Sequence, residues 1–296
     1  MKDKLYKPRV MARTRRISIR QTECQVYEWG DPLSPPLLYL HGWGDSAATF
    51  QFVVDHVHSA RRIIAPDWRG FGDSAHNPGS YWFPDYLADV DALLSALELP
   101  PSLPIVGHSM GANVASLFAG VFPERVSALI NIEGFGLPDS NPDDAPRRYR
   151  RWIETSRQRR EHPGYSDPKV LIDRIRDRSP TIDDQRARYV AACWTRPDAH
   201  GHLHLKADMA HRWPNAVLYR RSEVLACWQR ISAPTLLICG AESDFKDGVS
   251  EWQDPARCPF PNARCVTVPA AGHMLHFEQP GPLAVQIEEF LREHEV

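Results

Sequence analysis

The first half of the chain alternates short apolar runs with stretches of helical periodicity. The apolar runs have the length of strands buried in a sheet, the first two forming a hairpin, and they occupy residues 16–19, 25–29, 37–40, 62–65, 103–106 and 127–132. Apolar side chains at helical spacing predict helices over residues 86–97 and 110–122. Strands and helices in alternation predict an α/β fold with a mostly parallel sheet covered by helices.

The pattern changes after Gly136. Residues 137–230 are dense in Arg, Asp, Pro and His and contain helical stretches but no clear buried strand. Strand patterns resume at residues 235–239 and 263–268, and a helix over residues 283–293 follows. We therefore predict a core made of residues 1–136 and 231–296, with residues 137–230 inserted above the sheet as a helical cap.

Composition and charge narrow the class of protein. The chain has 296 residues and a formal net charge of −2, so no global basic field favours a nucleic-acid partner. No apolar run approaches the roughly 20 residues needed to span a bilayer. The N-terminus is locally basic, from Lys2 and Lys4 to Arg20, and we expect a solvated tail there. Six scattered cysteines favour reduced thiols and a cytoplasmic location. The sequence leaves the oligomeric state open.

One short motif carries the chemistry. The sequence GHSMG at residues 107–111 directly follows the strand predicted at 103–106 and opens a helix rich in small residues. A serine on such a sharp turn projects its hydroxyl above the sheet, and Gly107 and Gly111 leave the turn free of Cβ atoms. The start of the helix also directs free N–H groups at the site, so the Met110 amide can stabilise an oxyanion.

The GHSMG sequence resembles the nucleophile elbow of the α/β-hydrolase superfamily. Two further segments agree with this resemblance. HGWGD at 41–45 is similar to the His-Gly oxyanion loop of the superfamily, and DWRGFGDS at 67–74 is similar to a loop of its esterase and epoxide-hydrolase-like branches. Each segment follows a predicted strand, where open α/β sheets place their sites. The resemblance covers residues 30–136 and 231–296 and implies the α/β-hydrolase fold.

The resemblance implies roles for individual residues. Ser109 would be the nucleophile and His273, in a late Gly-His pair, the general base, because the order in this superfamily is Ser, acid, His. His276 competes with His273 but lies where the last helix is expected to start. Trp43 would supply a second oxyanion N–H beside that of Met110. A serine at position 109 argues against relatives that use an aspartate nucleophile.

The sequence leaves the acid of the triad open. The usual place lies three residues after the glycine that ends the strand at 235–239, and Ser243 stands there. We choose Asp244, one residue later, as the acid. Glu242 on the same loop is an alternative. Glu133, after the strand at 127–132, is another, because some relatives take the acid from that strand.

The surroundings of Ser109 suggest where substrate binds. We expect His41, His108, Phe135 and Met274 to lie around the substrate pocket, with His41 also holding its loop in place and His108 packing beside the nucleophile. The histidines at 200, 202, 204 and 211 invite a metal interpretation. No cysteine or carboxylate ligand pattern accompanies them, so we expect neither metal nor cofactor.

These parts predict a serine hydrolase of the carboxylesterase type. It would cleave a carboxylic ester of a small or medium apolar substrate through an acyl-enzyme on Ser109. A lactonase, a thioesterase, a C–C bond hydrolase or a perhydrolase could use the same triad, and a ligand receptor with slow turnover could keep it. The fold alone does not choose among these activities.

Overall fold

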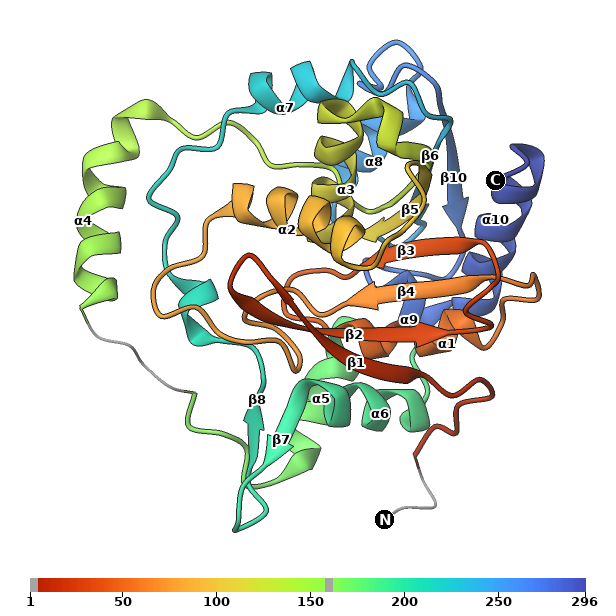
Figure 1. The fold of residues 1–296 in the computed structure, drawn as a ribbon. Coiled ribbons are helices and arrows are strands. Elements are labelled where there is room, and N and C mark those ends of the chain that lie inside the picture. Colours follow the sequence, from red (N-terminus) through yellow and green to blue (C-terminus); the bar gives the residue numbers. More distant parts are fainter. Residues whose placement is uncertain (1–4, 158–161) are drawn as a thin grey trace.

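A computed structural model describes residues 5–157 and 162–296 and contains one large sheet within that part of the chain (Figure 1). Its strand order is β1-β2-β4-β3-β5-β6-β9-β10. The β1–β2 and β2–β4 pairs are antiparallel and the other pairs are parallel, so the predicted mostly parallel sheet is confirmed. The strands are β1 (Arg13–Ile19), β2 (Thr22–Trp29), β3 (Pro36–Leu40), β4 (Arg62–Pro66), β5 (Leu103–His108), β6 (Val126–Ile132), β9 (Thr235–Gly240) and β10 (Ala263–Val268).

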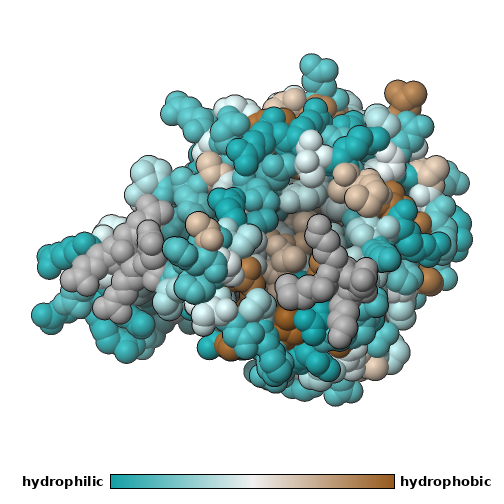
Figure 2. All heavy atoms as spheres, turned by 90° about the horizontal axis from the view of Figure 1, so that it is seen from below, coloured by the Kyte–Doolittle hydropathy of each residue, from teal (hydrophilic) through white to brown (hydrophobic). Residues whose placement is uncertain are grey.

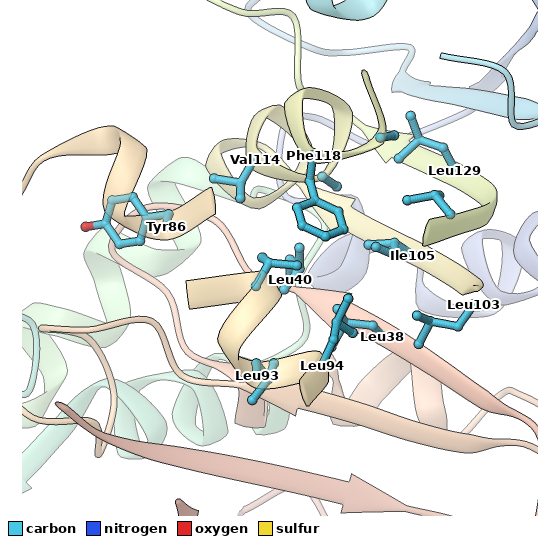
Figure 3. Packing of buried hydrophobic residues seen from close by; sticks show 14 of the residues in the cluster. Leu38, Leu40, Tyr86, Leu93, Leu94, Leu103, Ile105, Val114, Phe118 and Leu129 are labelled. Atoms are coloured by element: carbon cyan, nitrogen blue, oxygen red, sulfur yellow. The ribbon is translucent and has the colours of Figure 1, made fainter. Parts of the chain in front are cut away.

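One face of the sheet packs against four helices. They are α2 (Phe83–Ala96), α3 (Met110–Val121), α7 (Arg221–Trp228) and α8 (Lys246–Gln253). Figure 3 shows Leu38 and Leu40 of β3 directed towards Phe118 of α3 and Leu94 of α2. Burial of one such side chain stabilises the fold by about 1.5–3 kcal/mol. This packing holds α3, and the turn from which it starts, against the sheet.

The other face packs against α1 (Gln51–Val54), α9 (Leu275–Glu278) and α10 (Pro280–Glu293). Successive residues of a strand point to opposite faces, so Leu37 and Tyr39 meet this layer while Leu38 and Leu40 meet α2 and α3. Both faces of the sheet are therefore covered. This explains why the strands read as continuous apolar runs. The described residues also form four short 3-10 helices, η2 (Ala47–Phe50), η3 (Pro123–Arg125), η4 (Pro142–Asp144) and η5 (Met209–Arg212).

The insertion contains more than helices. It holds α4 (Ala145–Ser156), α5 (Pro168–Arg178) and α6 (Asp184–Trp194), followed by an unpredicted hairpin of β7 (Thr195–Pro197) and β8 (Leu203–Leu205). Apolar residues of α5 and α6 form a cluster with Phe52 and Phe277 of the core. A lid function for this insertion stays a prediction.

The last helix of the predicted insertion, α7, packs against the core. Helix α7 packs against α3 so closely that a Cβ on Gly120 would lie 2.0 Å from the Cys227 carbonyl oxygen. Trp228 is fully buried in the same cluster as Phe118. Helix α7 therefore belongs to the helical layer on this face of the sheet, and the bounds of the insertion stay a prediction.

The basic N-terminal segment is held by the core. Tyr6 Oη donates to Asp55 Oδ2 at 2.7 Å, and the Arg9 and Val10 amides donate to Asp55 Oδ1 at 3.0 and 2.9 Å. Arg9 and Val10 remain exposed, as expected of a solvated tail, but one buried carboxylate holds the segment in place. Lys2 and Lys4 lie outside the described residues.

The surface seen in Figure 2 is mainly hydrophilic, with hydrophobic side chains gathered near its centre. Among the residues that the structure describes, no helix has both the length and the apolar character to cross a membrane. All six cysteines are free thiols.

Candidate active site

Ser109 stands on the sharp turn between β5 and α3. Its backbone has φ 51° and ψ −114°, a left-handed conformation that a non-glycine residue adopts at a cost of order 1–3 kcal/mol. The flanking glycines are required sterically. A Cβ on Gly107 would lie 2.5 Å from the Ala112 Cα, and one on Gly111 would lie 2.1 Å from the Leu40 carbonyl oxygen.

His273 reaches Ser109 from the loop that follows β10. The distance from His273 Nε2 to Ser109 Oγ is 2.9 Å, within hydrogen-bond reach. The structure thus brings together the two side chains expected to be nucleophile and base. His276, the competitor, points elsewhere: its Nε2 donates to Asp45 Oδ2 at 3.0 Å.

Glu133 is the carboxylate that contacts His273. Its Oε2 lies 3.1 Å from His273 Nδ1, and its side chain has no exposed surface. Glu133 comes directly after β6 and has a positive φ of 58°. It also accepts hydrogen bonds from the Gly240 amide at Oε1 (2.8 Å) and from the Ser243 hydroxyl at Oε2 (2.6 Å).

The choice of Asp244 as the acid is therefore corrected. Asp244 and Glu242 are exposed, and among the described contacts neither side chain is bonded to His273. Strands β6 and β9 are neighbours, so both strand ends deliver side chains to the same edge of the sheet. Ser243 occupies the position where the acid was expected and donates to Glu133 instead.

The loop at residues 41–45 passes directly beside the nucleophile. A Cβ on Gly42 would lie 3.3 Å from Ser109 Cβ and 2.8 Å from His108 Nδ1, so only glycine allows this approach. Trp43 follows in the chain, and α3 begins at Met110, whose N–H has no partner within the helix. The amides expected to form an oxyanion hole thus come from the two segments that meet at Ser109.

His41 and His108, expected around the substrate pocket, are both buried within the protein. His41 Nε2 accepts from the Trp68 amide at 3.0 Å while Nδ1 donates to the Gly42 carbonyl at 2.8 Å, and burial lowers the pKa of His41 to about 4. Burial also holds the pKa of His108 well below its usual value, and His108 Nε2 donates to the His273 carbonyl oxygen at 2.8 Å. Both histidines hold loops in place.

Two exposed aromatic residues belong to the loops that approach Ser109 and His273. Trp43 and Phe245 are each 47% exposed, and the Phe245 ring centre lies 4.8 Å from that of His273. Phe135 is buried and its ring packs against Phe245 and Trp252, whereas Met274 is half-buried. We did not predict Phe245, although it directly follows Asp244 in the loop that was searched for the acid.

A buried polar cluster lies next to this site. Among the described residues, Asp45, His108 and His276 bring possible metal-ligand atoms within 4.8 Å of one another. Both oxygens of Asp45 already accept hydrogen bonds, from His276 and Thr49 and from Trp194 Nε1 at 2.8 Å, so these contacts favour a hydrogen-bonded cluster over an ion site.

Three of the four insertion histidines considered for metal binding make other side-chain contacts, and the fourth, His200, donates its backbone amide to Asp198 Oδ1 at 2.8 Å. His202 and His204 contact Asp198, and His211 stacks between Phe71 and Tyr81. Burial lowers the pKa of His211 to about 3.

Comparisons with known proteins identify the family. The family model described as alpha/beta hydrolase fold matches residues 35–280. The chain is 26% identical to a serine hydrolase-like protein from Danio rerio, over 94% of this chain and 87% of that protein. It is 27% identical to a putative 2-succinyl-6-hydroxy-2,4-cyclohexadiene-1-carboxylate synthase from Bacillus subtilis (strain 168), over 90% and 93% of the two chains.

A solved structure gives the same fold. The thioesterase domain from the curacin biosynthetic pathway superposes with a TM-score of 0.81 at 25% identity, over 94% of this chain and 99% of that domain. The expected fold is therefore confirmed, and the match to the family model extends through the insertion as well as the core. From the elbow, the sheet and these likenesses together, we conclude that the chain belongs to the alpha/beta hydrolase fold family and that a hydrolase is the activity this membership supports.

Proposed function

We propose that the chain is a serine hydrolase that cleaves a carboxylic ester of a small or medium apolar substrate through an acyl-enzyme on Ser109. The observation that carries the proposal is the continuous contact from Ser109 Oγ to His273 Nε2 (2.9 Å) and from His273 Nδ1 to Glu133 Oε2 (3.1 Å). A nucleophile bonded to a base that is oriented by a third group is the arrangement used in acyl transfer.

The first half of the reaction forms the acyl-enzyme. His273 Nε2 takes the Ser109 proton while Oγ adds to the ester carbonyl carbon, and the oxyanion that forms is held by the Trp43 and Met110 amides. Each such donor contributes roughly 3–4 kcal/mol of transition-state stabilisation. Glu133 accepts from Nδ1–H and stabilises the imidazolium. His273 then protonates the leaving oxygen, the C–O bond breaks, and the alcohol departs.

Water completes the cycle. His273 Nε2 removes a proton from water while the water oxygen adds to the acyl carbon. When this second tetrahedral intermediate collapses, the bond to Oγ breaks and His273 returns the proton to Ser109, so the acid product leaves and the free enzyme is restored. No further reactant is consumed.

The preference for an apolar substrate rests on the side chains around Ser109. Phe245 packs against the His273 ring, Trp43 follows Gly42 in the loop beside Ser109, and both side chains expose aromatic surface. Such surface favours acyl or alkyl groups through burial of apolar area. A thioester is the second candidate substrate, because a thioesterase domain is among the most similar solved structures and the same residues can perform the reaction.

A series of p-nitrophenyl esters of increasing acyl length, run beside the matching thioesters, tests the proposal. We expect kcat/KM on oxygen esters to depend on chain length and to exceed that on thioesters, with Ser109→Ala as the background control. Faster turnover of the thioesters would favour the second candidate. Tight binding of both series with no turnover would refute the enzyme and favour a ligand receptor.

A further inference from the structure

Helix α4 of the insertion is the most strongly amphipathic helix among the described residues. Its sequence, APRRYRRWIETS, carries four arginines against one glutamate. With 100° of rotation per residue, Tyr149, Trp152 and Ile153 fall within an arc of about 100° of the helix. The arginines fill the remaining arc, at positions 147, 148, 150 and 151.

The apolar arc of α4 is largely uncovered. Every residue of the helix is described and none is buried. Tyr149 is 51% and Ile153 43% exposed, whereas Trp152 is half-buried. Figure 1 shows α4 at the side of the molecule, separated from the sheet and from α5 and α6. The described residues therefore cover the apolar arc only in part.

The next helix along the chain, α5, differs from α4 in its apolar face. It is also basic, but its apolar residues Leu171, Ile172 and Ile175 are buried within the insertion cluster. The apolar side chains of α5 therefore pack against other parts of the protein. Among the residues that the structure describes, no side chain of α4 is buried in this way.

The charges on α4 indicate what covers it. Arg147 is paired with Asp144 and Arg150 with Glu154, but both arginine side chains remain at least 80% exposed, and Arg148 and Arg151 add two further positive charges. The whole chain has a formal net charge of −2, so this positive charge is local to the helix. A surface that covers α4 should therefore carry negative charge for the arginine arc and accept aromatic and aliphatic side chains from the apolar arc.

We propose that α4 lies in the headgroup region of a membrane that contains anionic phospholipid. Tyr149, Trp152 and Ile153 would enter the interface while the arginines contact the phosphates. Tyr and Trp are the residues that favour this depth of a bilayer. The helix would hold the protein against the membrane surface without spanning it. The inference is independent of ester hydrolysis, because it concerns binding and needs no turnover.

Sedimentation of the full chain with vesicles tests the proposal. Vesicles of phosphatidylcholine alone are compared with vesicles that also contain phosphatidylglycerol, at low and high salt. We expect the chain to bind the anionic vesicles, and we expect this binding to weaken as the salt concentration rises. Arg148→Gln combined with Arg151→Gln should lower the partition constant about 25-fold, because each arginine near an anionic surface is worth about fivefold. Tyr149→Ser with Ile153→Ser should lower it by at least about tenfold.

Matched variants separate this site from general charge attraction. Arg176→Gln with Arg178→Gln removes two positive charges from α5, where the apolar face is buried, and should leave binding unchanged. Arg148→Lys with Arg151→Lys keeps the charge and should keep binding. The wild-type chain staying in the supernatant with both kinds of vesicle would overturn the proposal. An equal loss of binding in the α4 and α5 glutamine variants would overturn it as well.

Discussion

Replacing Glu133 with glutamine isolates the role of one buried carboxylate. In the structure Glu133 accepts from the Gly240 amide at Oε1, and from Ser243 and His273 at Oε2. A glutamine can keep its oxygen towards Gly240, and the Ser243 hydroxyl can turn to accept from the new amide group. His273 Nδ1 must then accept a hydrogen bond, so its proton moves to Nε2 and that nitrogen no longer takes the Ser109 proton.

The wrong tautomer sets the size of the effect. Loss of the orienting carboxylate at a Ser-His-Asp triad lowers kcat about 10⁴-fold, which is about 5 kcal/mol in activation free energy. We expect a similar loss of kcat for Glu133→Gln on a p-nitrophenyl ester, with little change in Tm because the other hydrogen bonds persist. Asp244→Asn is the matched control and should stay within about twofold of wild type, since Asp244 is exposed. A collapse of activity in Asp244→Asn with normal activity in Glu133→Gln would refute this reasoning.

Three other changes test the same region. A fluorophosphonate probe should label the wild-type chain and fail to label Ser109→Ala, and retained labelling would place the nucleophile elsewhere. Gly42→Ala puts a Cβ 2.8 Å from His108 Nδ1 and 3.3 Å from Ser109 Cβ, so kcat should fall at least about tenfold, while a normal rate would contradict the close approach of this loop. Burial raises the pKa of Asp67 to about 7, so the folded state holds a proton that the unfolded chain releases near pH 4. The free energy of unfolding, measured with urea, should therefore fall as pH rises from about 4 to 7. If the slope of this free energy against pH were the same in Asp67→Asn, the assignment to Asp67 would be refuted.

The sequence predicted the parts of the site that depend on local structure. A serine between two glycines after an apolar strand requires a turn of one kind, and that turn forms at Ser109. The pairing with His273 follows from the order of strands and loops in a fold of this type. The strands were also predicted well, because residues buried on both faces of a sheet leave continuous apolar runs.

The carboxylate could not be chosen from the sequence, because the choice depends on contacts between neighbouring strands. Glu133 and Asp244 each follow a strand, and both strand ends lie at the same edge of the sheet. The positive φ of Glu133 and the donors from Gly240 and Ser243 turn its side chain towards His273. These are tertiary interactions that no local pattern records.

The insertion was predicted least well, for a related reason. Its helices bury few residues, so polar periodicity marked their presence but not their limits. The hairpin of β7 and β8 is too short to give an alternating pattern, and the packing of α7 against α3 depends on the close approach at Gly120.

Asp45 forms hydrogen bonds that connect three segments distant from one another in the chain. Its two oxygens accept from Thr49 of η2, from Trp194 at the end of α6 and from His276 near the base. Exchange of the insertion for that of a relative would remove the indole donor and leave a buried carboxylate with one bond fewer, at a cost of about 1–3 kcal/mol. Chimeras that aim to change specificity should therefore keep a tryptophan at this junction, or replace Asp45 along with the grafted segment.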